Sequence, residues 1–149
     1  MTAPAKFQQG VMLLEAMIGI LIFSIGILAM IAMQGLAIGY VSDAKYRSDA
    51  AFFANELLGQ MWVDRANIPN YTWPGGSSPV VQAWATRVTT TATTALPGAA
   101  ANPPTVSLVT TVDPVTSAVT YTVTVTVRWM APNTQSAHSY QTLALISPP

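Results

Sequence analysis

The most prominent pattern along the chain is an apolar run from Val11 to Val41 in which Glu15 is the one charged residue. A run of this length without proline predicts a continuous helix, and about 20 apolar residues already suffice to cross a bilayer. The run is also too long for the roughly 7–15-residue apolar core of a cleaved secretory signal. An ionised carboxylate costs roughly 2.5–3.5 kcal/mol at the centre of a membrane helix. Glu15 is therefore a candidate functional residue that needs a partner.

Beyond the apolar run, residues 42–67 have the pattern of an amphipathic helix. Apolar residues recur there in three- and four-residue steps and share one helical face, whereas Lys45, Asp49 and Glu56 lie on another side. We expect this helix to end near Asn67, because Pro69 follows, and its apolar face to pack on a sheet. The apolar face consists of Tyr46, Ala50, Phe53, Leu57 and Met61.

The last third of the chain carries the clearest strand pattern. Residues 119–129 read VTYTVTVTVRW, in which valines and aromatic residues alternate with threonines and Arg128. Such alternation is typical of an antiparallel strand with one buried face. Residues 105–112 and 139–146 predict two further strands, since turn-like segments separate them from this one. The expected architecture is an α+β fold, a long helix packed on a small antiparallel sheet of three or four strands.

The segment between the helix and the strands has two parts. Residues 68–79 have the composition of a loop, in which we expect Tyr71 and Trp73 to cap the sheet edge. A short helix is predicted around Val80–Thr90, and the threonines that follow argue against a longer one.

Composition narrows the function classes. The six basic and six acidic side chains cancel, so the chain lacks the basic footprint of a nucleic-acid binder. The absence of cysteine excludes a disulfide scaffold, a thiol nucleophile and a cysteine zinc site. His138 is the one histidine and lies in a predicted turn, which favours a surface residue over a metal ligand or general base. No nucleotide-binding loop or nucleophile elbow is present, and we expect no catalytic residue, metal or cofactor.

The segment KFQQGVMLLEAMIGILIFSIGIL, which begins at Lys6, resembles the N-terminus of a type IV prepilin. In that family a membrane peptidase cuts after the glycine that ends a short polar leader, and glutamate is the fifth residue of the mature chain. The resemblance implies cleavage between Gly10 and Val11, N-methylation of Val11, and Glu15 at the fifth mature position. The family usually starts its mature chain with phenylalanine or methionine, so Val11 departs from the pattern. The chain would then comprise a leader, a membrane and assembly helix, an amphipathic continuation of that helix and a globular part with the loop, short helix and sheet (residues 1–10, 11–41, 42–67 and 68–149).

The resemblance also implies a partner for Glu15. In a growing fibre the glutamate of one subunit pairs with the α-amine of a neighbour, and an apolar setting magnifies that attraction. Glu15 would set the register between subunits, as a polar residue does at a buried coiled-coil position. Two interpretations stay open for the glycines of the run: a surface for close helix packing, or the ordinary glycine usage of membrane helices. These are Gly19, Gly26, Gly35 and Gly39.

Two weaker similarities point to PilV-type minor pilins: LLGQMWVDRAN at residues 57–67, and Trp84 followed by LPG at residues 96–98. The implied function is a structural or assembly-priming subunit of a type IV pilus. A minor pseudopilin of a type II secretion system shares the leader and the helix-plus-sheet plan and is the alternative. A membrane-anchored receptor or enzyme domain is a third. The expected partners are other pilins and minor pilins, the prepilin peptidase, the assembly machinery of the bacterial inner membrane and the bilayer, with the globular part in the periplasm.

Overall fold

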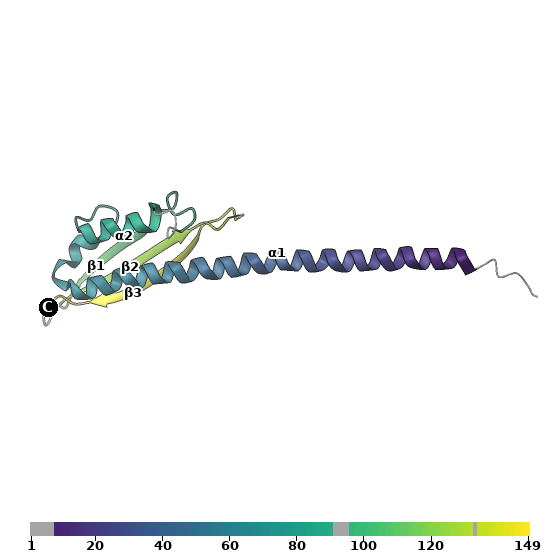
Figure 1. The fold of residues 1–149 in the computed structure, drawn as a ribbon. Helices are drawn as coiled ribbons and strands as arrows, with labels where there is room; N and C mark the ends of the chain where they lie inside the picture. The colour runs from purple at the N-terminus through teal and green to yellow at the C-terminus, as the bar shows by residue number, and fades with distance from the viewer. Residues whose placement is uncertain (1–7, 91–95, 133) are drawn as a thin grey trace, which may run out of the picture. The chain divides into compact units, whose positions relative to one another are not determined.

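The computed structural model describes residues 8–90, 96–132 and 134–149. They form an α+β fold in which a long N-terminal helix contacts a three-stranded antiparallel sheet, as the sequence predicts (Figure 1). The chain divides into two compact units, Met1–Val41 and Ser42–Pro149, and we call the second unit the head. The elements are α1 (Gln8–Val63), the 3-10 helix η1 (Arg65–Tyr71), α2 (Pro79–Thr90), β1 (Thr105–Val112), β2 (Val119–Trp129) and β3 (His138–Ile146).

The first unit consists, in its described part, of the N-terminal portion of α1. Every residue from Val11 to Val41 is exposed, including large apolar side chains such as Met12 (75 %) and Phe23 (69 %). Within the described residues, α1 is the one helix that is long and apolar enough to cross a membrane by length and composition, and it lies near the N-terminus, where a signal sequence would pass the same test. Because burying one large apolar side chain is worth about 1.5–3 kcal/mol, this surface requires lipid or protein to cover it.

In the head, α1 buries the face that the sequence pattern predicts. Ala50, Leu57 and Met61 are fully buried, and Phe53 is 7 % exposed. Tyr46 is partly buried and packs against the same core. The three- and four-residue spacing puts these side chains on one side of the helix, where they meet the sheet and α2.

The end of α1 differs from the prediction. The α-helix stops at Val63 rather than near Asn67, and the chain continues as η1 through Tyr71, where a loop was expected. The Asp64 side chain accepts hydrogen bonds from Asn67 Nδ2 (2.7 Å) and from the Tyr71 hydroxyl (3.0 Å). Ile68 is completely buried. Packing of Ile68 and Tyr71 therefore tightens this segment into a 3-10 helix, although it contains Pro69.

Helix α2 begins at Pro79, a residue that the first turn of a helix tolerates. It runs to Thr90, in agreement with the predicted Val80–Thr90 segment. Trp84 is fully buried, and its indole Nε1 donates a hydrogen bond to the carbonyl oxygen of Phe53 at 2.9 Å. This buried bond joins α2 directly to α1.

The sheet has the order β1-β2-β3, with β2 antiparallel to both neighbours (Figure 1). The three predicted strands are confirmed, and Val123 at the centre of β2 lies between Leu108 of β1 and Ala144 of β3. Alternate residues of β2 from Val123 to Trp129 are buried, whereas its threonines stay half-exposed. The core of the head thus lies between one sheet face and the two helices.

Trp73 extends the sheet at the free side of β1, as expected for a capping residue. Its backbone N–H donates to the Val106 carbonyl at 3.0 Å, and the Val106 N–H donates to the Trp73 carbonyl at 2.9 Å. Tyr71, the other predicted capping residue, is 1 % exposed. The two aromatic residues therefore close this end of the core.

Candidate functional site

The predicted processing site lies at the beginning of α1. Gly10 is in the first helical turn, and Val11 is 65 % exposed on the helix that follows. Lys6 and the rest of the predicted leader up to residue 7 lie outside the described residues. Within the predicted site, the structure therefore places Gly10, Val11 and Glu15 on one continuous helix.

Glu15 is exposed on α1, one helical turn beyond Val11 and on the same side. Among the residues that the structure describes, no Lys or Arg side chain forms an ion pair with it. Gly19 and Gly26 share its face within an arc of about 40°, and apart from the adjoining helix backbone no atom of the described chain lies within 4 Å of where a Cβ would stand at either glycine. The carboxylate is thus carried on a face that another helix can approach closely.

Beyond Val41, residues 42–51 of α1 carry four charged side chains, and exposed apolar side chains then recur on the side of α1 that points away from the core of the head. Phe52, Trp62 and Val63 are 67 %, 49 % and 90 % exposed. Phe52 and Val63 lie within about 20° of each other around the helix axis, opposite the buried Leu57. These three residues form what we call the outer stripe, and nothing in the sequence pattern singled them out.

His138 is placed differently from the prediction. It is the first residue of β3, not part of a turn, and its ring stacks on that of Trp129 with centroids 5.7 Å apart. Its Nδ1 lies 3.8 Å from Oδ1 of Asp43, a carboxylate on α1. The His138 side chain is 37 % exposed, so His138 is a surface residue. The sequence could not reveal Asp43 as its neighbour, because only the fold brings these two positions together.

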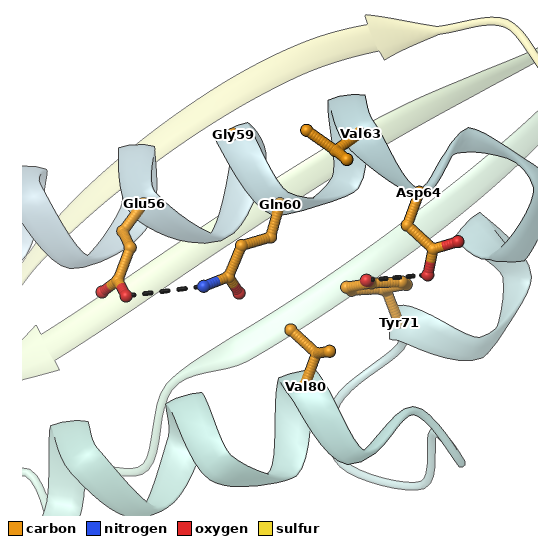
Figure 2. Close-up of a pocket in the computed structure, with 7 residues that line it drawn as sticks. All are labelled: Glu56, Gly59, Gln60, Val63, Asp64, Tyr71 and Val80. Atoms are coloured by element: carbon orange, nitrogen blue, oxygen red, sulfur yellow. Dashed lines mark hydrogen bonds between the residues drawn. The ribbon is translucent and has the colours of Figure 1, made fainter.

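An open groove of about 580 Å³ lies between the last turns of α1, η1 and the start of α2 (Figure 2). Glu56, Gln60 and Asp64 follow one another at four-residue spacing along one side of α1 and turn toward the groove (Figure 2). This spacing was visible in the sequence, but α2 and η1 are needed to form the opposite wall. The remaining lining residues are Gly59, Val63, Tyr71 and Val80.

Hydrogen-bond acceptors dominate the polar part of this groove. Glu56 Oε1 accepts from Arg87 Nη2 at 2.7 Å and from Gln60 Nε2 at 3.5 Å. Asp64 Oδ2 accepts from the Tyr71 hydroxyl; burial and this bond raise the pKa of Tyr71 above its usual value near 10. Glu56 Oε2 and Gln60 Oε1 are shielded from solvent and have no donor among the described residues. The acceptors in this groove therefore exceed the donors supplied to them.

Within the described part of the chain, no three His, Asp or Glu side chains come close enough to hold a metal ion. The chain matches no protein-family model, no curated protein and no solved structure in comparisons with each. The architecture itself is pilin-like: a long apolar N-terminal helix whose C-terminal part packs on a three-stranded antiparallel sheet.

Proposed function

We propose that the protein is a minor pilin, a structural or assembly-priming subunit of a type IV pilus, and not an enzyme. In this proposal a prepilin peptidase removes residues 1–10 by cutting after Gly10. The apolar part of α1 holds the processed chain in the inner membrane with the head in the periplasm. The assembly machinery then transfers it into a fibre, where it contacts other pilins and minor pilins.

The observation that carries the proposal is the extent of the exposed apolar surface of α1. Exposed apolar side chains occupy the helix from Val11 to Val41 and recur on the head, after the charged residues 42–51, as Phe52, Trp62 and Val63. A bilayer needs only about 20 apolar residues. A helix that serves only as an anchor has no use for an outer stripe beyond the membrane, whereas a subunit that packs against the helices of its neighbours uses both parts.

The position of Glu15 supports the same proposal. Its carboxylate shares a face with Gly19 and Gly26, two positions that carry no side chain. A neighbour's α-ammonium group can therefore reach it with little steric hindrance. Close approach in an apolar setting strengthens the attraction between these two charges.

A minor pseudopilin of a type II secretion system would use the same surfaces. The similarity of residues 57–67 and of Trp84 with residues 96–98 to PilV-type sequences favours the pilus. Recovery of the protein in sheared surface fibres, compared between strains that lack one or the other system, separates these two functions.

The first prediction concerns processing. Intact-mass measurement of the protein extracted from membranes should show loss of residues 1–10, with or without one methyl group on Val11. Replacing Gly10 by leucine should leave the unprocessed chain in the membrane, because the cleavage site of the family tolerates little volume. A mature species that still carries Lys6, in a host with an active prepilin peptidase, would contradict the proposal.

The second prediction concerns Glu15→Gln. Membrane insertion and processing should continue, since a neutral amide is easier to bury than a carboxylate. The amount of protein in sheared fibres should fall strongly, because the neighbour's ammonium group is left without a counter-charge in an apolar environment. Fibre number should be counted as well, since a defect in an assembly-priming subunit would also lower the number of fibres.

Ser24→Ala is the matched control for Glu15→Gln. Ser24 is polar and lies on the same apolar helix, but its hydroxyl donates to the Ile20 carbonyl of its own chain at 2.7 Å. Its removal should leave fibre incorporation and fibre number unchanged. Normal incorporation of Glu15→Gln, with normal fibre number, would remove the registration role from Glu15.

A further inference from the structure

We propose that the groove lined by Glu56, Gln60 and Asp64 binds a basic side chain, a lysine ammonium or an arginine guanidinium, presented by a neighbouring subunit. The ligand chemistry follows from the groove itself. Only the source of the ligand, another subunit of the fibre, rests on the proposed function.

The charge in the groove is incompletely balanced from within the chain. Arg87 neutralises the Glu56 end through its 2.7 Å bond to Oε1. At the other end, Asp64 receives only neutral donors, the Tyr71 hydroxyl and the Asn67 amide. Among the described residues, no Lys or Arg side chain forms an ion pair with Asp64. A cation in the groove would therefore meet an unneutralised carboxylate.

Gln60 supplies an independent observation that points to a hydrogen-bond donor from outside. Its Oε1 is buried and has no partner among the described residues, while its Nε2 faces Glu56. A buried acceptor without a donor destabilises the folded chain, because the acceptor has lost its hydrogen bonds to water. A ligand that brings several N–H groups between Glu56 and Asp64 would satisfy this oxygen as well as Asp64.

The walls of the groove suit the stem of such a ligand. Val80 faces the groove from α2, and Gly59 and Val63 line its edge on α1 (Figure 2). Lysine and arginine side chains lay their methylene stems along apolar surface while the charged end meets polar groups. A simple metal cation has no stem to fill this volume, and the described residues provide no cluster of three ligands for one.

The ligand chemistry is tested with butylguanidinium and with butylurea, its neutral analogue of similar shape. The full-length protein, in detergent micelles, is titrated with each, and the amide NMR signals of residues 56–64 are followed. We expect saturable shifts with butylguanidinium and weaker or no shifts with butylurea. Equal shifts with both compounds would show an apolar groove without cation selectivity, and no saturable shift with butylguanidinium would also overturn the proposal.

Two variants of Gln60 should move the affinity in opposite directions. Gln60→Glu adds a charged acceptor and should tighten butylguanidinium binding about two- to fivefold, the range of an exposed ion pair. Gln60→Lys places an ammonium group in the groove and should weaken binding by at least as much. Asn55→Lys, on an exposed position of the same helix, adds the same charge outside the groove and should have little effect. Misfolding would weaken binding in either variant and cannot tighten it in Gln60→Glu. Unchanged affinity for butylguanidinium in both Gln60 variants would refute the site.

Fibre incorporation tests the source of the ligand separately. If a neighbouring subunit provides the basic side chain, Gln60→Lys should lower the amount of protein in sheared fibres relative to Val115→Lys. Val115 is 90 % exposed in the turn between β1 and β2, so this control adds the same charge to the head away from both the groove and the outer stripe. Normal incorporation of Gln60→Lys would exclude a neighbouring subunit as the source. Absence of the wild-type protein from fibres would instead contradict the proposed function, and the titration would still decide the ligand chemistry.

Discussion

Phe52 and Phe53 are adjacent in the chain but belong to different environments. Phe53 is 7 % exposed in the core of the head, whereas Phe52 is 67 % exposed on the outer stripe. The 100° rotation between successive helical residues separates the two faces. Identical side chains at neighbouring positions therefore have different roles, one in the stability of the head and one at a surface available to partners.

This difference predicts a contrast between two alanine variants. Phe53→Ala should lower the free energy of unfolding of the head by roughly 3–5 kcal/mol, because it leaves a cavity in the core. Phe52→Ala should change it by less than about 0.5 kcal/mol. Thermal or denaturant unfolding of the full-length protein in detergent, followed by near-UV circular dichroism, measures both. Similar losses in the two variants would contradict the assignment of faces.

At the scale of elements, the junction of α1 and η1 depends on a hydrogen bond between Tyr71 and Asp64. The phenol donates to the carboxylate at 3.0 Å, and Tyr71 is 1 % exposed. Burial, followed by the bond to Asp64, raises the pKa of Tyr71. Folding therefore favours the protonated phenol, so this contribution to stability is complete below about pH 10, the usual tyrosine value, and is lost as pH rises through the raised pKa.

The corresponding prediction uses Tyr71→Phe. At pH 6–9 the variant should be less stable than the wild type by about 1.5 kcal/mol, the lower end of the range for a hydrogen bond to a charged group. Above pH 10 the difference should shrink and then change sign, because the tyrosinate would be buried beside a carboxylate. Comparison with the variant cancels the titration of the other tyrosines. A difference that stays constant from pH 6 to pH 11 would contradict the role of this bond.

At the scale of the whole molecule, the two units differ in how their apolar surface is covered. Every residue of the hydrophobic core belongs to the head, beginning with Ala50 on α1, and every side chain from Val11 to Val41 is exposed. The head thus contains its own core, whereas the first unit depends on lipid or on other chains. Removal of the residues before Ser42 should therefore make the protein soluble without detergent and leave the stability of the head unchanged.

This separation predicts that residues 42–149 fold without detergent. They should show circular dichroism of mixed helix and strand and a cooperative thermal transition, since they contain the complete core. Residues 64–149 are the matched control, because they lack the α1 face formed by Ala50, Phe53, Leu57 and Met61 and should not fold cooperatively. Aggregated or unfolded protein from residues 42–149 would contradict the prediction.

The features that the sequence predicted by itself are those with a local cause. The period of two in residues 119–129 and the three- and four-residue steps from Tyr46 to Met61 each follow from the geometry of one strand or one helix. The α+β fold, the three strands and the short helix α2 were accordingly predicted. The prepilin-like segment around Gly10, Val11 and Glu15 was also visible, since its signal is a spacing along the chain.

Tertiary structure decided the features that depend on residues distant in the chain. The burial of Ile68 and the bond from Tyr71 to Asp64 make residues 65–71 a 3-10 helix, where the sequence predicted the end of the amphipathic helix near Asn67 and a loop from residue 68. The neighbourhood of His138 and Asp43 arises because β3 begins beside α1. The groove exists only where α2 and η1 meet the last turns of α1. In each case the deciding contact joins separate elements, and hydrophobic periodicity within one element carries no information about it.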